Sequence, residues 1–491
     1  MTRYRAYLVL FAVIYALCFA VALPAFIDEA YTYNLVTDAS LTHMLSALAH
    51  GADGAFPAYP LFAFGWAKVL GASELSLRLT GGLFVILFVW HCGERLLRRF
   101  PPMPTAVALA FILANERFIF YTIQSRFYGL VVFLFSLMFW STWDLLQDKA
   151  IPPRRRFSHG VACGLLCLSH PLGIVYAGIL ALLYAAFSTC RRTFSWWNSA
   201  SFLGGPVCLL AWLPAFQLQK GINAVFSPGE SIPGWTKYWE FAFLDSKVLF
   251  AIVLVGAGLL AVANRTWKRG GAAALSGGEA VSPPGDENRA GNTLLIIYAI
   301  SFVLVLNATL ALLDWAHVIP VYSMLAVRYV LVSAVAYAVI VAGILERLED
   351  MVRRAGKPRW GAAAGRLVLL LMLVGLLAGM ATSWSRWLLE KSSMESTLAR
   401  LSKIARDQGL EIVCEDHESA FLLATRGGAA NVKYVLAEDF PFKTLMRRIH
   451  DYYPQPVPVS MAQFQQITND FVLLPAGKAP VVIHHPATPA P

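Results

Sequence analysis

Charged residues are scarce in this chain. Lys, Arg, Asp and Glu together make up 14% of its 491 residues, whereas hydrophobic residues make up 57%. Soluble domains carry roughly 25% charged residues, so this composition excludes a soluble globular protein. Runs of about 20 apolar residues recur, and each is long enough to cross a hydrocarbon core of about 30 Å as a helix. The chain is therefore expected to be a membrane protein with many helical spans.

Cysteines and internal repeats are also lacking. Six of the seven cysteines lie in or beside apolar runs, and Cys414 alone lies in the C-terminal segment. This placement excludes a disulfide framework and a cysteine-ligated metal site. No internal repeat of the kind found in many secondary transporters is visible.

Eleven spans are predicted, at residues 6–26, 78–97, 103–121, 127–146, 157–169, 171–189, 197–216, 246–264, 292–313, 323–345 and 366–384. The fifth and sixth could instead form one helix over 157–189, kinked at Pro171. Breaking the chain at His170 and Pro171 keeps Arg191 and Arg192 on the cytoplasmic side. With a cytoplasmic N-terminus, 21 Lys and Arg then fall in cytoplasmic segments and eight in short outer loops and span ends, as the positive-inside rule requires. The net charge of +10 thus reflects topology and gives no reason to expect nucleic acid as a partner.

The predicted fold class is an all-α polytopic membrane protein with a small C-terminal α/β domain outside the membrane. Residues 1–385 form the transmembrane domain, with a first outer loop at 27–77 whose second half is amphipathic and lies along the membrane surface. Residues 265–291 have the composition of a flexible cytoplasmic linker. Residues 386–491 read as a helix (LARLSKIARDQGL), strands (EIVCE and VKYVLA) and a disordered tail.

Two adjacent carboxylates, Asp28 and Glu29, follow the first predicted span in the stretch PAFIDEAYTYN. An ionised side chain is costly deep in a bilayer but not at its boundary. The pair could therefore mark a solvated helix end or belong to a site at the depth of the lipid headgroups.

A second polar group lies at the predicted outer hairpin NERFIFYTIQSRFYGL, where Arg117 and Arg126 stand among Gln124, Tyr128 and other aromatic residues. The planar guanidinium suits phosphate oxygens and stays charged at physiological pH. The alternative is a pair of arginines that reach to the interface within an aromatic belt.

Two further stretches map to the same outer side. His170 lies at the break between the fifth and sixth spans, where a packing role competes with a functional one, and Arg328 with Tyr329 opens the tenth span. A cation just inside a span usually has a partner or lines a polar cavity. Together with Asp28, these residues predict an outward-facing site that suits a lipid phosphate.

The order of these features resembles the GT-C superfamily of polyprenyl-phosphate-sugar transferases. An acidic pair follows the first helix, a Pro-rich aromatic stretch runs to SELSLRLTGGLF, QSRFYGL opens the fourth helix, and RYVLVSA lies in a late one. The nearest branches are the dolichyl-phosphate-mannose protein mannosyltransferases and the bacterial lipid A aminoarabinose transferases. The chain departs from them where it has AFPAYP, residues 55–60, in place of a His-Pro-Pro-Leu-Tyr-like stretch, so that Tyr59 remains as a substrate-pocket candidate.

The resemblance implies a bacterial inner-membrane enzyme that transfers a sugar, with inversion, from a polyprenyl-phosphate carrier to a lipid, glycan or protein acceptor. It implies that Asp28 is the general base, that Glu29 assists it, and that cations such as Arg126, with Arg117 and Arg328, bind the donor phosphate. The candidates for the substrate pocket are Tyr59, Gln124, Tyr128, His170 and Tyr329. No organic cofactor is implied. The acidic pair leaves room for a divalent cation, but no third ligand can be read from spacing, so a metal stays unassigned.

Two other functions use the same substrates. A lipid-linked sugar transporter or flippase would need ionisable residues near the middle of several spans, and few are seen. An envelope polysaccharide polymerase or ligase would carry its large outer loop in the later half of the chain, whereas here the largest internal outer loop comes first.

Overall fold

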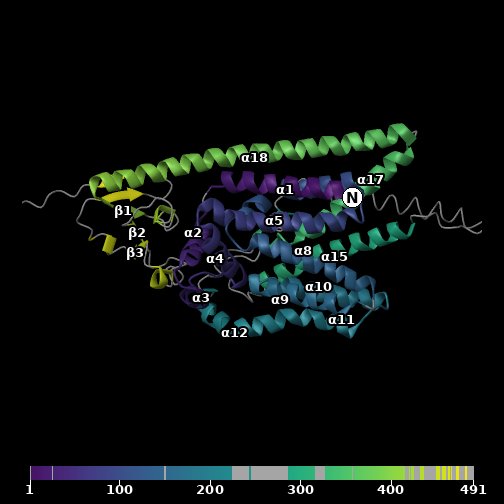
Figure 1. The fold of residues 1–491 in the computed structure, drawn as a ribbon, viewed down its shortest axis with the longest axis horizontal. Coiled ribbons are helices and arrows are strands. Elements are labelled where there is room, and N and C mark those ends of the chain that lie inside the picture. Colours follow the sequence, from purple (N-terminus) through teal and green to yellow (C-terminus); the bar gives the residue numbers. More distant parts are fainter. Residues whose placement is uncertain are drawn as a thin grey trace, which may run out of the picture.

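The computed structural model describes residues 2–24, 26–148, 151–223, 243–244, 286–315, 327–355 and 358–414, together with short segments between 420 and 483. The described part is a bundle of roughly parallel and antiparallel helices with a small sheet beyond one end (Figure 1). We call that end of the bundle the sheet end, and the end that holds the N-terminus the amino end. The predicted span at 246–264 and most of the predicted linker at 265–291 lie outside the described residues.

The bundle consists of long helices joined by short connections. The helices are α1 (Thr2–Ala22), α5 (Glu74–Leu97), α6 (Pro102–Leu113), α7 (Glu116–Ile123), α8 (Tyr128–Gln147), α9 (Pro153–Ser169), α10 (Gly173–Cys190), α11 (Trp196–Ala200), α12 (Gly204–Asn223), α15 (Asp286–Trp315), α16 (Val327–Val330), α17 (Ser333–Ala355) and α18 (Pro358–Gln408). A 3₁₀ turn, η1 (Ser201–Leu203), joins α11 to α12. In the described part, seven helices are long and apolar enough to cross a membrane, or eight if the bent pair α6 and α7 counts as one span. The chain is an integral membrane protein.

The structure corrects one predicted span and the end of the predicted linker. The predicted span at 103–121 is broken, because α6 and α7 meet at an angle of 71°. Asn115 causes a new start there: its side chain accepts a hydrogen bond from the backbone N–H of Phe118 at 2.9 Å, as an N-cap does. The predicted linker at 265–291 also extends too far, because residues 286–291 already belong to α15.

The break predicted at His170 and Pro171 is present. Helix α9 ends at Ser169 with His170 in extended conformation, and α10 begins at Gly173. Gly173 allows the tight return, since a Cβ there would lie 2.3 Å from the carbonyl oxygen of Leu166. The chain therefore runs back along itself instead of forming one kinked helix.

The first loop is helical and covers the sheet end of the bundle (Figure 1). It contains α2 (Ile27–Thr37), α3 (Leu41–Ala49) and α4 (Ala58–Leu70), and it ends earlier than predicted because α5 starts at Glu74. Ser73 caps α5 by accepting from the N–H of Ser76 at 3.2 Å.

The C-terminal region forms a five-stranded sheet in the order β3-β2-β1-β4-β5. Its strands are β1 (Glu411–Cys414), β2 (Val432–Val435), β3 (Val457–Val459), β4 (Phe471–Leu474) and β5 (Val481–Ile483). All neighbours pair in parallel except β4 and β5, which are antiparallel. The strands predicted at EIVCE and VKYVLA are thus confirmed. The domain boundary predicted at 385 falls inside α18, which continues without a break from the apolar segment to Gln408.

The sheet region contacts the first loop through Tyr452 and Tyr453. The Tyr453 hydroxyl donates to Oδ2 of Asp38 at 3.1 Å, and Nδ1 of His43 lies 2.5 Å from the same oxygen. Partial burial would raise the pKa of Asp38, but the hydrogen bonds from His43, Ser40 and Tyr453 outweigh it and hold that pKa below its ordinary value. The Asp38 carboxylate therefore links the two regions in its charged form.

Candidate active site at the sheet end of the bundle

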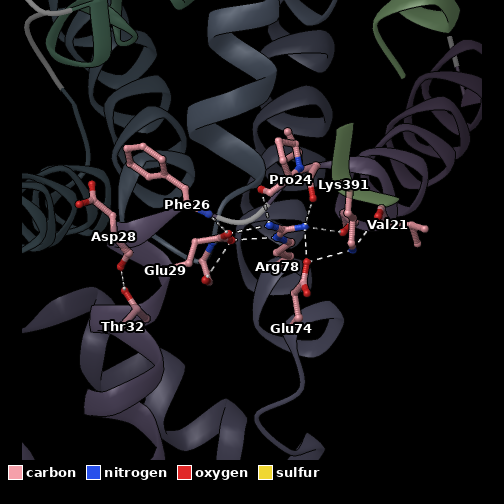
Figure 2. Close-up of polar contacts among 12 residues, drawn as sticks. Val21, Pro24, Phe26, Asp28, Glu29, Thr32, Glu74, Arg78 and Lys391 are labelled. Carbon is pink, nitrogen blue, oxygen red and sulfur yellow. Dashed lines mark hydrogen bonds and ion pairs between the residues drawn. The ribbon is translucent and has the colours of Figure 1, made fainter. Parts of the chain in front are cut away.

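Asp28 and Glu29 lie in the first turn of α2, but their side chains point to different neighbours (Figure 2). Residues 100° apart on a helix face different directions, so adjacent carboxylates need not share a site. Glu29 is 2% exposed, whereas the Asp28 side chain keeps 19% of its surface accessible. The two acids therefore have different environments.

Glu29 forms a buried, bidentate ion pair with Arg78 of α5. Nε and Nη2 of Arg78 donate to the two oxygens of Glu29 at 2.8 and 2.6 Å (Figure 2). The Arg78 side chain is fully buried and also donates to the carbonyls of Leu23 and Pro24, at 2.5 and 2.8 Å. This cluster fixes the end of α1 and the start of α2 against α5.

The Glu29 carboxylate also accepts hydrogen bonds from its surroundings. The backbone N–H of Ser125 donates to Oε1 at 3.1 Å, and the N–H of Phe26 donates to Oε2 at 3.3 Å as part of a capping box. Glu29 therefore ties α2 to the turn between α7 and α8, which carries Arg126.

Two glycines bring that turn close to α5. A Cβ on Gly81 would lie 2.6 Å from the carbonyl oxygen of Thr122 and 2.7 Å from that of Gln124. A Cβ on Gly129 would lie 2.8 Å from the same Thr122 oxygen. Only glycine permits such close backbone packing, so these positions set the distance between Arg78 and the Ser125–Arg126 turn.

Arg126 is buried and meets Asp53 in a second bidentate pair. Its Nη1 and Nη2 atoms donate to the Asp53 oxygens at 2.5 and 3.1 Å. Nη1 also lies within hydrogen-bond distance of the Thr32 hydroxyl, at 3.2 Å, and of the Asp28 carbonyl, at 3.3 Å. Burial would lower the pKa of Arg126, but the charges of Asp53 and Asp28 outweigh it and raise that pKa. Arg126 is therefore a permanent cation that holds the first loop.

The Asp28 carboxylate has few protein contacts. Its Oδ2 lies 3.9 Å from Nε of Arg126, and no described side chain hydrogen-bonds either oxygen. Nε of Arg126 is buried and has no hydrogen-bond partner among the described residues. A partly exposed carboxylate beside an unused cationic donor can accept a proton and receive a polar ligand.

Arg328 in α16 supplies a second cation near Asp28. The charge of Asp28 acts on its guanidinium, and the neutral side chains of Tyr128 and Tyr329 lie close to it. Arg328 stacks on Tyr329 with 5.0 Å between its central carbon and the ring centre, and its buried Nε has no partner among the described residues. The guanidinium is thus available for an anionic ligand.

Aromatic and amide side chains complete the surroundings. The His170 ring lies 4.8 Å from the Phe127 ring and 5.7 Å from the Tyr329 ring, centre to centre. Its Nδ1 accepts from the N–H of Leu172 at 3.1 Å, and burial together with Arg328 and Arg126 lowers the pKa of His170 to about 3. Gln124 is fully buried, and neither its amide oxygen nor its nitrogen has a partner in the part of the chain described. Neutral His170 is a polar group close to the two arginines, and the unused Gln124 amide lies two residues before Arg126 in the chain.

The remaining predicted residues lie less centrally. The hydroxyl of Tyr59 pairs with Thr80 at 2.8 Å in the interior, although Arg126 and Asp53 act on it electrostatically. Arg117 is exposed on α7, and its charge acts on Glu116, which pairs with Arg386 of α18 at 2.7 Å. No described contact joins Arg117 to Asp28.

Two residues of the site were not among the sequence candidates. They are Arg78, a cation at the end of a predicted span, and Asp53, an acid in the first outer loop. The available signals were an arginine one turn after Glu74 at a span start, and an acid between Gly51 and Gly54 in the first outer loop. Their exact partners depend on chain packing and could not be read from spacing.

A metal site is not evident from the side-chain placement. Within the described ranges, no three His, Cys, Asp or Glu side chains converge as metal ligands would. Glu29, the acid expected to be nearest to Asp28, is engaged by Arg78. A metal therefore stays unassigned.

Comparisons with known proteins agree on the fold. No family model matches the chain, and no curated protein matches it in sequence. Among solved structures, ArnT from Cupriavidus metallidurans bound to undecaprenyl phosphate is similar at a TM-score of 0.55 and 12% identity, covering 97% of this chain and 93% of that one. The same protein in the apo state gives a TM-score of 0.56 at 12% identity over 96% and 93%. Archaeal oligosaccharyltransferase AglB from Archaeoglobus fulgidus gives a TM-score of 0.47 at 12% identity over 87% and 64%. Over nearly its whole length, the chain is similar in fold to ArnT.

Proposed function

We propose that this chain is a membrane glycosyltransferase that moves a sugar from a polyprenyl-phosphate carrier to an acceptor hydroxyl, with inversion at the anomeric carbon. The observation that carries the proposal is the partly exposed Asp28 carboxylate beside Arg126 and within electrostatic range of Arg328. The ArnT fold supports it, because ArnT has been seen with undecaprenyl phosphate bound. The sheet end would face the extracytoplasmic side of a bacterial inner membrane, with the N-terminus in the cytoplasm and eleven spans in all.

The proposed reaction uses Asp28 as general base. The acceptor oxygen attacks the anomeric carbon while its proton passes to an Asp28 oxygen, and the bond from that carbon to the phosphate oxygen breaks with its electron pair staying on the phosphate. A positioned base contributes about 10² to 10⁴ in rate. Cationic donors oriented in advance stabilise the phosphate charge as it develops.

The two arginines are proposed to have different tasks. Asp53 accepts hydrogen bonds from Nη1 and Nη2 of Arg126. Arg126 would therefore contact the phosphate through Nε, and its main effect would be to hold α2 and the first loop. The Arg328 guanidinium has no hydrogen bond among the described residues and would be the main hydrogen-bond donor to the phosphate. Glu29 is proposed to position Asp28 and Arg126 through Arg78 and Ser125, because its carboxylate is already engaged. Tyr128, Tyr329, Gln124 and His170 would line the substrate pocket.

The decisive experiment is transfer by the purified full chain, reconstituted with a panel of polyprenyl-phosphate sugars. Asp28→Asn should reduce kcat by about 10²-fold or more with little change in donor KM, whereas Asp28→Glu should keep part of the activity. Size-exclusion profiles of both variants report folding. A folded, fully active Asp28→Asn protein would refute the general base.

The same reconstituted samples test the transporter alternative. Movement of a fluorescent lipid-linked sugar across the bilayer without any glycosyl product would favour a flippase over a transferase.

A further inference from the structure

A second polar site lies at the amino end of the bundle, away from Asp28. It is a cavity of about 910 Å³ between the C-terminal ends of α5 and α8 and the start of α9. Arg5, near the N-terminus, pairs with Glu94 of α5 at 3.2 Å, which places these helix ends beside the start of α1. Arg78 and Arg95 are 17 residues apart on α5, so at 1.5 Å per residue the two sites are about 25 Å apart.

Arginines dominate the wall of this cavity. Five of them line it, against one acidic residue: Arg95, Arg98, Arg99, Arg154 and Arg155, with Asp144. Arg95 pairs with Asp144 at 2.9 Å, and Arg98 pairs with Glu94. The other three have no acidic partner in the part of the chain that the structure describes.

A buried donor also lines the cavity. Trp143 is 1% exposed, and its indole N–H has no hydrogen-bond partner among the described residues. A buried N–H without a partner costs free energy unless a ligand or water satisfies it. Arg98, Arg154 and Arg155 are exposed, as positive charge left by topology alone would be, but topology does not explain a buried indole N–H without a partner in the same wall.

We propose that this cavity binds a phosphate group, offered either by an anionic lipid headgroup or by soluble phosphate. Guanidinium groups bind phosphate oxygens through paired N–H donors, and three of the five have no acidic partner within the described ranges. Basic pockets between membrane helices on the cytoplasmic side are suited to anionic headgroups. The site is independent of the proposed transfer reaction, since it lies at the opposite end of the bundle.

The test is calorimetric titration of the full chain in phosphate-free detergent. The probes are inorganic phosphate, dihexanoyl phosphatidic acid below its micellar concentration, and dihexanoyl phosphatidylcholine, which has no net charge. The cavity variant replaces Arg99, Arg154 and Arg155 with Gln. The matched control replaces Arg3, Arg191 and Arg366, three exposed arginines that do not line the cavity, with Gln. Trp143→Phe removes the indole donor and keeps an aromatic ring at that position.

The wild type and the matched control should bind an anionic probe equally, and the cavity variant should bind it about tenfold more weakly or worse. Trp143→Phe should weaken binding severalfold. Binding of phosphatidic acid alone identifies a lipid source, and binding of both anions identifies a site for phosphate itself. Equal loss in the cavity variant and the matched control, no binding of either anion to the wild type, or equal binding of phosphatidylcholine would overturn the proposal. If the cavity variant does not elute as a folded protein, unchanged binding by Trp143→Phe decides against it.

Discussion

Arg126 and Asp53 join the turn before α8 to the first loop through two hydrogen bonds, of 2.5 and 3.1 Å. The pair is buried, and it lies directly beside the Asp28 carboxylate. It connects residues 73 positions apart in the chain, so the geometry around Asp28 depends on both partners.

Removing one member of this pair should be worse than removing both. Asp53→Asn leaves Arg126 buried without its counter-charge, a change that costs about 3 to 5 kcal/mol in comparable pairs. Asp53→Asn combined with Arg126→Gln should recover part of the unfolding temperature but not the transfer activity. Thermal unfolding of the two single variants and the double variant measures the coupling, and additive losses would contradict it.

Arg328→Gln should raise the donor KM more than it lowers kcat, because its guanidinium has no hydrogen bond in the described part of the chain. Arg117→Gln is the matched control, since Arg117 is an exposed arginine on α7. Steady-state kinetics with varied donor concentration separates the two variants. Equal effects would point to surface charge and away from a specific phosphate contact.

Glu29→Gln should act mainly on stability. It leaves the fully buried Arg78 with Glu74, 2.6 Å away, as its remaining acidic partner, so the expected loss is about 3 kcal/mol or less, below the full cost of an unpaired buried charge. Glu390→Gln on α18, an exposed acid, should leave the unfolding temperature within experimental error. A stable Glu29→Gln protein that has lost only kcat would instead make Glu29 a catalytic group.

Gly81→Ala should separate α5 from the turn before α8. The new Cβ would lie within 3.0 Å of three carbonyl oxygens, those of Thr122, Ile123 and Gln124. Gly65→Ala, where nothing lies within 4 Å of the new atom, is the control. We expect reduced thermal stability and activity for Gly81→Ala alone; wild-type behaviour would show that the turn can move without consequence.

The contact between the first loop and the sheet region should weaken in acid. The folded-state pKa of Asp38 is lowered, so its stabilisation is present above the ordinary value of about 3.9 and is lost as pH falls through the lowered pKa. The protection of residues 449–453 against hydrogen exchange, taken relative to the intrinsic rate at each pH, should therefore fall at low pH in the wild type. Asp38→Asn should show the reduced protection already at neutral pH.

The membrane class and most span positions could be predicted from sequence, because apolar length alone determines them. Apolar length does not predict the bend at Asn115, where Asn115, Glu116 and Arg117 interrupt the apolar run and a local N-cap starts a new helix. The candidate site was predicted in part. Asp28, Arg126 and Arg328 follow from charge at span ends, but the division of Asp28 and Glu29 between two partners depends on where Arg78 lies on α5. Asp53 was missed because an acid between glycines in a loop is expected to be exposed to solvent. Its burial depends on how the loop packs, which the sequence does not show.

Helix α18 has a mechanical consequence. It runs for 51 residues, about 75 Å at 1.5 Å per residue, and joins the sheet directly to a membrane-spanning segment. Lys391 on this helix pairs with Glu74 at 3.0 Å and donates to the carbonyl of Val21 at 2.9 Å, so it touches the same helix ends that Arg78 holds (Figure 2). A stiff rod attached at that point cannot tilt without pulling on α1 and α5. A force applied to the sheet would therefore reach the region of Asp28 as a displacement of the helix ends around it.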